Sequence, residues 1–264
     1  MKALPLTPGR WFDGLAQACE QLRQDWPGLT AVADVCIASL SLQAAAGPEV
    51  RAMITFTRAV AHDLEALVLR AGPEAEPRYH NRLHTADVLL TVATMLHALD
   101  AASDAAAQPW AAAMLAAAAA HDFAHPGGVN AQRFDIESRS WRGVAVHAAQ
   151  LPEPWRSSIE SLILHTDPQT VPDNHARVAG QAFVWSQAWC QVLLNEADIL
   201  LSASSRFGPA LSQALAQEWQ RVGFAAHATV ATPAGRAQFL RSTRFSSPAA
   251  MALAMPEQVR QQLQ

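Results

Sequence analysis

The chain has 264 residues, half of them apolar, and a formal net charge of −4 at pH 7. This length and apolar content are sufficient for one large packed domain, and we expect residues 1–264 to form a single domain. The sequence contains no basic block, which argues against nucleic-acid binding through a charged surface.

The cysteines argue against a disulfide framework and against a thiolate zinc site. Cys19, Cys36 and Cys190 are far apart and form no Cys-x-x-Cys pair. The first residues lack the apolar run of a signal peptide, and outside the alanine runs no apolar stretch is long enough for a membrane span. We therefore expect a cytoplasmic protein that binds neither a membrane nor nucleic acid.

The residue pattern predicts an all-α protein. Alanine and leucine are abundant, and no alternating apolar and polar run ends at an Asn-Gly or Asp-Gly turn. Residues 1–70 are expected to form amphipathic scaffold helices. The His62-Asp63 pair in this region lies in a pattern typical of a solvated helix face, so we do not expect it to bind a ligand.

Two histidines follow a loop at residues 72–77 and precede a stretch with helical periodicity at 88–99. His80 and His84 are four residues apart, a spacing that places both rings on one face if the segment is helical. The alternative is two surface histidines near a helix start. Loop-to-helix junctions, however, are also where functional polar groups collect.

The most informative stretch lies in the middle of the chain. Residues 110–120 are almost entirely alanine, which favours a helix and is small enough for a deep core. The next residues read His121-Asp122-Phe123-Ala124-His125-Pro126-Gly127-Gly128, and the proline and glycines should end the helix there. Burying an imidazole beside a carboxylate is unfavourable unless something pairs or coordinates them, and a metal ion is the simplest explanation.

A second acidic group lies in an apolar helix predicted at residues 180–201. Asp198, flanked by alanine and leucines, is expected to point inward, and Glu196 on another face is the competing candidate. Before this helix we predict an amphipathic helix at 155–166. After it we predict a loop at 202–209, helices at 211–226 and 249–253, and a polar tail.

These segments supply one set of nitrogen and oxygen donors. The set comes from three separate helices and consists of His84, His121, Asp122 and Asp198. Such donors suit Zn, Fe or Mn better than a metal that prefers thiolates.

The same residues fall into two motifs with a family resemblance. Tyr79-His80-Asn81-x-x-His84-x-Ala86-Asp87 and His121-Asp122-x-x-His125-Pro126-Gly127-x-x-Asn130 closely resemble the signatures of the class I cyclic nucleotide phosphodiesterase catalytic domain, which belongs to the HD-domain metal phosphohydrolases. The resemblance runs from about residue 79 to 201. It implies a compact multi-helix bundle with a dimetal site.

The resemblance also implies roles for these residues. His84, His121, Asp122 and Asp198 would hold a tight Zn, Fe or Mn ion, and Asp122 would bridge to a second ion, Mg or Mn. Such ions lower the pKa of a shared water, and the resulting hydroxide attacks the phosphorus. His80 would be the general acid, a role that an imidazole can fill near neutral pH. The catalytic set would be His80, His125 and Asp122. His125 and Asn130 would orient water or the phosphate, and Tyr79 would contact the substrate. Asn81 and Asp167 would support these residues from behind.

The C-terminal part departs from the family pattern. The family clamps the substrate base with a Gln followed three residues later by a Phe; if Phe239 is that Phe, Arg236 holds the Gln position and Gln238 is displaced. We predict that Arg236, Gln238 and Phe239 contact the substrate. The chain would then comprise scaffold helices at 1–70, a metal-site core at 79–201 and helices at 202–264 that line the pocket.

The expected activity is metal-dependent hydrolysis of cAMP, cGMP or a related phosphodiester. One alternative is an HD-superfamily nucleotidase or another phosphoester hydrolase, although the Gly-Tyr-Pro signature of the enzymes that cleave cyclic dinucleotides is missing. Another is an inactive HD module that binds a ligand. The expected partner is a small nucleotide or phosphodiester substrate, and a homodimer remains an open option.

Overall fold

The structure, a computed structural model, describes residues 3–42 and 47–264. Within these ranges the regular elements are all helices, which confirms the predicted all-α fold. The elements are α1 (Trp11–Gln24), α2 (Leu29–Ser39), α3 (Pro48–Ala71), the short 3-10 helix η1 (Pro73–Ala75), α4 (Arg82–Ala98), α5 (Gln108–Ala120), α6 (Asp135–Gly143), α7 (Ala145–Ala148), α8 (Trp155–Leu164), α9 (Val171–Val178), α10 (Gln187–Ala203), α11 (Gly208–Arg221), α12 (His227–Val230), α13 (Pro233–Ser242), α14 (Pro248–Ala252) and α15 (Met255–Gln262).

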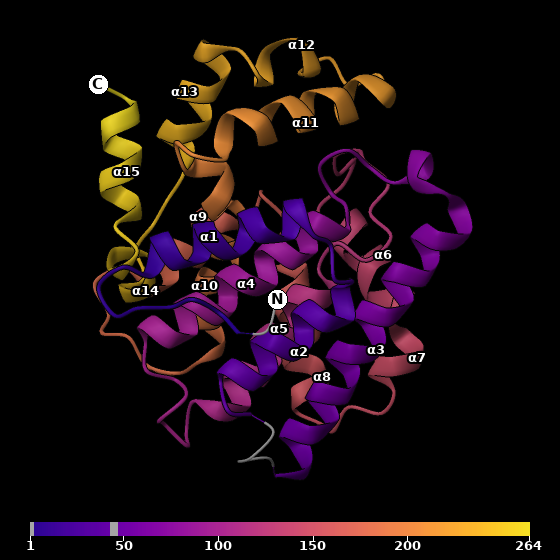
Figure 1. Ribbon diagram of the computed structural model, residues 1–264, viewed down its shortest axis with the longest axis vertical. Helices are drawn as coiled ribbons and strands as arrows, with labels where there is room; N and C mark the ends of the chain where they lie inside the picture. Colours follow the sequence, from indigo (N-terminus) through magenta and orange to yellow (C-terminus); the bar gives the residue numbers. More distant parts are fainter. Residues whose placement is uncertain (1–2, 43–46) are drawn as a thin grey trace.

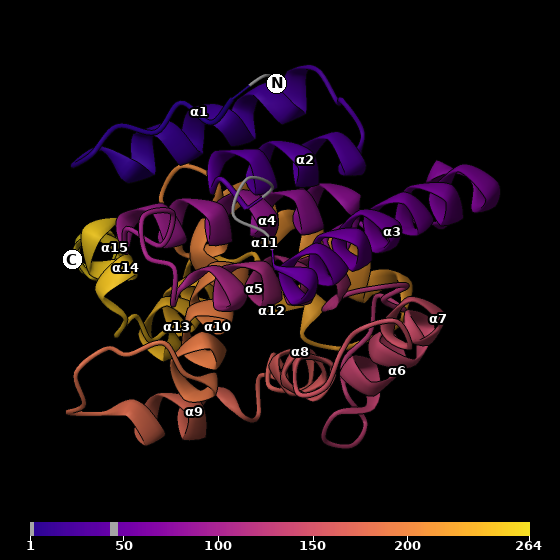
Figure 2. The ribbon, with the colours of Figure 1, turned by 90° about the horizontal axis from the view of Figure 1, so that it is seen from below.

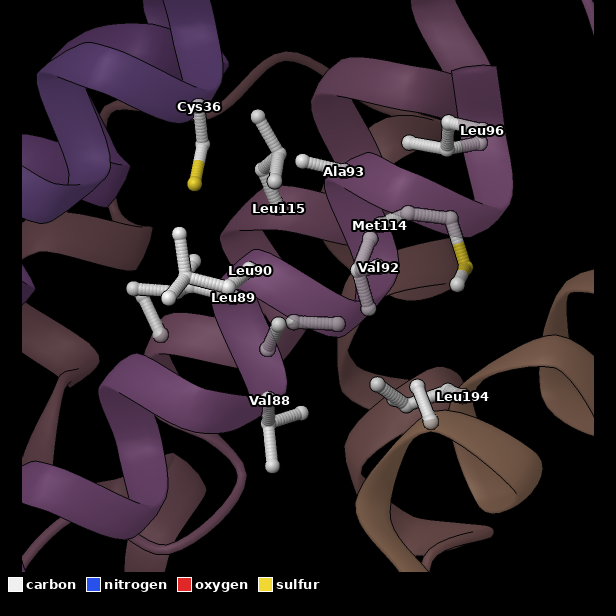
Figure 3. Close-up of a cluster of buried hydrophobic side chains, with 14 of the residues drawn as sticks. Cys36, Val88, Leu89, Leu90, Val92, Ala93, Leu96, Met114, Leu115 and Leu194 are labelled. Carbon is white, nitrogen blue, oxygen red and sulfur yellow. The ribbon is translucent and has the colours of Figure 1, made fainter. Parts of the chain in front are cut away.

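Three mutually contacting helices, α4, α5 and α10, form the centre of the molecule. Every residue from Ala111 to Ala120 on α5 is buried. Because alanine projects little beyond the backbone, the larger side chains of neighbouring helices can pack closely around α5. Figure 3 shows part of this core, where Cys36 of α2 and Leu89 of α4 lie near Leu115 of α5. Because α5 is apolar on all sides, the polar pair His121-Asp122 lies directly after its last residue, Ala120.

The remaining helices are arranged around this centre. In Figure 2, α1 and α2 lie at the top, α4 and α5 lie beneath them, and α8 and α9 lie at the bottom. Figure 1 shows α11, α12 and α13 together at one end of the molecule. Among the described residues, no helix is both long enough and apolar enough to traverse a bilayer.

Several predicted boundaries are wrong. The helix predicted at 180–201 begins only at Gln187, where Ser186 Oγ accepts a hydrogen bond from Trp189 N, and it continues to Ala203. The expected polar tail is the helix α15. His80 precedes α4 and does not share it with His84, because Asn81 is the N-cap of that helix.

Candidate metal centre and active site

His84 lies in the first turn of α4, and its position is fixed by the cap of that helix. The Asn81 side chain accepts a hydrogen bond from His84 N at 3.0 Å and donates one to Arg78 O at 2.9 Å. An N-cap of this kind satisfies a backbone N–H that the helix leaves without a partner. Asn81, predicted as a support, therefore anchors the backbone from which the His84 ring projects.

His121 and Asp122 follow α5 directly. Ala118 O can only accept, so the His121 Nδ1–H donates to it at 2.9 Å, and the proton is fixed on Nδ1. This leaves the Nε2 lone pair available, which is the form of imidazole that binds metals. Ala124 then adopts a left-handed conformation, with φ of 56°, and the chain reverses toward His125.

The four predicted ligands converge. His84 Nε2 lies 3.3 Å from Asp122 Oδ2 and 3.0 Å from Asp198 Oδ1. His121 Nε2 lies 3.3 Å from Asp122 Oδ2 and 3.6 Å from Asp198 Oδ1. Residues 114 positions apart in the chain, His84 and Asp198, thus approach each other where α4, α5 and α10 meet.

These atoms lie close together without forming hydrogen bonds. His84 Nε2, His121 Nε2 and Asp122 Oδ2 are all buried and have no hydrogen-bond partner. Leaving one buried polar atom unsatisfied costs about 1 to 3 kcal/mol, so three at one point indicate a missing partner. Two imidazoles and two carboxylates that share a focus fit a divalent cation such as Zn, Fe or Mn.

The electrostatics of the site also call for positive charge. Burial lowers the pKa of His84, but the neighbouring carboxylates of Asp122 and Asp198 outweigh burial and raise it to about 9. The pKa of His121 is also raised, since Asp122 and Asp198 again overcome burial. Burial opposes ionisation of both carboxyls, yet the histidines hold the pKa values of Asp122 and Asp198 well below the usual range. The carboxylates therefore stay ionised, and either protons or a cation must balance them.

Beside this cluster lies a second polar group built on His80. The Glu218 carboxylate accepts from the backbone N–H of Tyr79 at 2.6 Å and from that of His80 at 2.9 Å, and its other oxygen lies 2.5 Å from His80 Nδ1. Burial opposes ionisation of Glu218, but these contacts lower its pKa overall. An ionised Glu218 therefore accepts the Nδ1–H of His80.

His125 stacks on His80, with ring centroids 3.8 Å apart. Gly127 N donates to His125 Nδ1 at 3.0 Å, so this nitrogen carries no proton. Burial, assisted by the adjacent His80, lowers the pKa of His125 to about 4. His125 is therefore neutral near pH 7, whereas His80 is the ring with the carboxylate partner.

A cavity of about 440 Å³ opens beside both clusters. Its lining includes the polar residues His80, Asp122, His125 and Asp198 and the apolar residues Leu215, Trp219, Phe224 and Phe239. Volumes of this order hold small-molecule ligands, which are gripped by apolar walls and oriented by a few polar groups. The helices near one end of the molecule in Figure 1, α11 and α13, supply much of the apolar wall.

Three more of the predicted site residues, Asn130, Asp167 and Tyr79, line this cavity and are occupied by internal hydrogen bonds. Asn130 Nδ2 donates to both Glu137 carboxylate oxygens, at 3.1 and 2.9 Å, and Asn130 Oδ1 accepts from Ile136 N. Asp167 accepts from Phe134 N and Gln169 N. Tyr79 Oη lies 2.8 Å from Ser202 Oγ. These side chains shape the cavity wall.

Two residues predicted to contact the substrate do not line the cavity. The Arg236 guanidinium donates to Ser202 O, Ser204 O and Gln262 Oε1, at 3.0, 2.8 and 2.6 Å. It therefore joins the end of α10 to α15. Gln238 lies on the exposed side of α13, and only Phe239 of the predicted trio faces the cavity.

The sequence interpretation missed two buried acids. Glu218 contacts His80 across 138 positions, and no local spacing signals this pairing. Glu137 lines the cavity, and burial raises its pKa to about 7 against the opposing effect of Asn130. Glu196, the competitor of Asp198, instead accepts from Ser246 N at 2.5 Å and Ser247 N at 2.9 Å.

A comparison with protein families matches the segment that contains both sequence motifs. The model of the family described as 3'5'-cyclic nucleotide phosphodiesterase matches residues 79–151. A search of curated proteins found no match. The matched segment contains His80, His84, His121, Asp122 and His125, and the match supports a phosphodiesterase hydrolase. Residues 79–151 of this chain are thus similar in sequence to the 3'5'-cyclic nucleotide phosphodiesterase family.

Proposed function

We propose that this protein is a metal-dependent phosphodiesterase that hydrolyses a cyclic nucleotide, 3',5'-cAMP or cGMP. The observation that carries the proposal is the cluster of buried, unpartnered His84, His121 and Asp122 atoms beside a cavity that also contains His80. The family match over the same segment supports a phosphoric diester as the bond that is cleaved.

The residues present fit divalent ions. His84, His121, Asp122 and Asp198 would hold one ion, Zn, Fe or Mn, and Asp122 would contribute to a second, Mg or Mn. Divalent ions at this position would stabilise the negative charge that develops on a phosphoryl group during hydrolysis.

His80 is the proposed general acid. Its Nδ1–H is held by the Glu218 carboxylate, which leaves Nε2 as the ring nitrogen that can give a proton to the departing sugar oxygen. The backbone contacts of Glu218 prevent its carboxylate from rotating away from the His80 ring. Neutral His125 stacks against the His80 ring and fixes its plane without adding a competing charge.

The base of the nucleotide would lie against the apolar wall. Leu215, Trp219 and Phe239 offer flat and aliphatic surfaces, and a planar base can be held between such groups. Gln169 also lines the cavity, and no side-chain hydrogen bond within the described residues uses its amide. Because a primary amide both donates and accepts, Gln169 is the proposed reader of the base edge.

A related phosphodiester is the second candidate substrate. Arg236 turns away from the cavity to bind backbone carbonyls, and Gln238 is exposed, so the base clamp predicted from the sequence is not assembled. An apolar wall alone would accept other flat leaving groups, such as an aryl group.

A substrate panel tests the proposal. We expect kcat/KM for cAMP or cGMP to exceed that for bis(4-nitrophenyl) phosphate, because both the apolar wall and Gln169 would contact the base. Gln169→Ala should reduce the discrimination between cAMP and cGMP by about tenfold, since one polar contact to a base is lost. The matched control is Gln150→Ala, which removes an exposed amide that does not line the cavity. If neither nucleotide is cleaved better than the aryl ester, the cyclic nucleotide is not the substrate.

A further inference from the structure

A second cavity, of about 590 Å³, lies apart from the catalytic one. It is formed by α9, the start of α10 and the segment 243–246, and it shares no lining residue with the catalytic cavity. Neither the family match nor the proposed reaction gives it a role. Its size is within the range of small-molecule sites.

The single charged side chain among the described lining residues of this cavity, that of Arg244, is suited to an anion. Arg244 lines the cavity, is exposed, and has no hydrogen-bond or ion-pair partner in the part of the chain that the structure describes. None of its described lining residues is acidic. A free guanidinium presents a planar fork of donors that matches the two oxygens of a carboxylate or phosphate.

His175 adds a buried polar atom without a partner. The residue is 6% exposed, its Nδ1 lies 2.8 Å from Ser246 Oγ, and its Nε2 is buried and forms no hydrogen bond. Leaving such an atom unsatisfied costs about 1 to 3 kcal/mol, a penalty that a ligand oxygen at Nε2 would remove. When Nδ1 accepts the proton of the Ser246 hydroxyl, Nε2 carries the proton of the neutral ring, so this ring and Arg244 are both able to donate to an oxyanion.

The remaining wall is aromatic and held in place. Trp189 is 5% exposed, and its Nε1–H donates to Ala182 O at 3.1 Å. Its ring packs against Phe183 with centroids 5.4 Å apart. Phe245 lines the cavity next to Arg244. An aromatic surface beside a cation favours a ligand that combines a flat ring with a negative group.

We propose that this cavity is a second ligand site, which binds a small oxyanion carried on a flat ring. Two sources share this chemistry: a nucleoside monophosphate and an aromatic carboxylic acid. In either case the oxyanion pairs with Arg244 and reaches His175, and the ring lies against Trp189 and Phe245. This inference does not depend on the proposed phosphodiesterase activity, because the two cavities share no residue.

Hydrogen bonds connect the lining of this cavity to the buried core of the protein. Ser246 Oγ contacts His175, while Ser246 N donates to the buried Glu196 of α10. The segment that lines the cavity is therefore tied to the helix that carries Asp198, and it is not a loose surface loop.

Isothermal titration with three probes tests the proposal. Adenosine 5'-monophosphate represents the phosphate source, benzoate represents the carboxylate source, and adenosine is the control without an anion. We expect at least one of the two anions to bind the full chain in this cavity with a Kd below about 1 mM, and adenosine to bind there at least tenfold more weakly, because it lacks the group that pairs with Arg244.

Variants assign the binding to this cavity. Arg244→Ala should weaken it at least tenfold, while Arg241→Ala, an exposed arginine outside the lining, should not change it. Ala179→Trp should block binding by filling the space, and its unchanged melting temperature would show that the fold survives. His121→Ala should weaken only the binding of the monophosphate at the catalytic centre, which separates the two sites.

Two outcomes would overturn the proposal. One is the absence of measurable binding of both anions at this cavity. The other is binding that survives both Arg244→Ala and Ala179→Trp, since it would then belong to another place on the protein.

Discussion

Glu218 determines how His80 faces the catalytic cavity. The carboxylate binds both the backbone and the ring of the Tyr79-His80 segment, and it is 1% exposed. Because it touches His80 and not the cavity, Glu218 is a positioning residue. It keeps one ring nitrogen occupied so that the other is presented to a ligand.

Glu218→Gln should therefore impair only reactions that need a proton for the leaving group. We expect kcat for a cyclic nucleotide to fall by roughly 10- to 100-fold, since the amide no longer holds the His80 Nδ1–H as the carboxylate does. The rate for bis(4-nitrophenyl) phosphate, whose leaving group needs no proton, should fall much less. The alkaline limb of the pH–rate profile, which reports the loss of the proton from a general acid, should also change for the nucleotide.

An equal loss on both substrates with an unchanged pH profile would contradict the positioning role. Glu218 would then be important for folding alone.

Gly127 and Gly128, the two glycines that follow His125-Pro126, differ in the space around their Cα atoms. Gly127 has a φ of 76°, and a Cβ added there would lie 3.2 Å from Glu218 Cγ, whereas a Cβ at Gly128 would meet nothing within 4 Å. Gly127→Ala should destabilise the protein by about 1 to 2 kcal/mol, because alanine in a left-handed conformation is strained. It should also lower activity by displacing Glu218.

Gly128→Ala is the matched control and should leave both properties nearly unchanged. Chemical denaturation and the nucleotide assay measure the two effects. Equal behaviour of the two variants would show that the contact between Gly127 and Glu218 is unimportant.

The sequence predicts the residues that converge at the candidate metal site better than it predicts the residues that support them, for a physical reason. His84, His121 and Asp122 sit in short motifs whose spacing and surroundings signal chemistry, and the apolar flanks of Asp198 indicate an inward position. Glu218 occurs in an ordinary amphipathic helix, and its partner is 138 positions away. Such a contact depends on how α11 packs over the site, which no local pattern encodes.

At the scale of helices, one ion pair joins α1 to α4. Arg23 donates from both terminal nitrogens to Asp87, at 2.9 and 2.6 Å, and Asp87 is 3% exposed. This geometry satisfies both carboxylate oxygens and fixes α1 against the helix that carries His84. Asp87, the last residue of the motif that begins at Tyr79, therefore has a structural role in the packing of α1 against α4.

Removing the buried carboxylate should be costly. Asp87→Ala leaves the Arg23 charge uncompensated at the α1–α4 contact and should lower the free energy of unfolding by about 3 to 5 kcal/mol. The control is Asp13→Ala, which breaks the exposed Arg10–Asp13 pair and should change stability by no more than about 1 kcal/mol. Urea unfolding measures both. Similar values for the two variants would contradict the assigned importance of the Arg23–Asp87 pair.

Helix types were more predictable than helix ends. The all-α fold follows from composition and periodicity, but the predicted start of the helix carrying Asp198 was seven residues too early, at 180 instead of Gln187. Gly180 has a φ of 73°, and Ser186 caps the true start. The aromatic residues between them suit a helix interior as well as a loop, so hydrophobicity alone extended the prediction. Arg236 likewise matched a motif position while its side chain serves the contact between α10 and α15.

At the scale of the whole molecule, a buried histidine links stability to pH. Burial, together with the nearby positive charge of Arg244, lowers the pKa of His175 from 6.5 to about 4. The folded protein thus favours the neutral ring. The stability that His175 provides is complete above a pH of about 6.5 and is lost as the pH falls toward 4.

His175→Gln should remove this part of the pH dependence. Between the two pH limits, the difference in unfolding free energy between the parent and the variant should shrink by about 1 to 2 kcal/mol, a value reduced by water in the adjoining cavity. Unfolding in urea at several pH values measures it. A difference that stays constant with pH would show that His175 does not titrate in this way.

The central claim, that α4, α5 and α10 bring together a metal site beside a separate proton donor, is tested most directly by metal content. The parent protein and the His121→Ala, Asp198→Ala and His80→Ala variants would be saturated with Mn or Zn, desalted, and analysed for bound metal and for cyclic nucleotide hydrolysis. We predict that His121→Ala and Asp198→Ala lose the tightly bound ion, whereas His80→Ala retains it and loses roughly 10²- to 10⁴-fold in rate. Full metal content in His121→Ala and Asp198→Ala, or full activity in His80→Ala, would contradict the account.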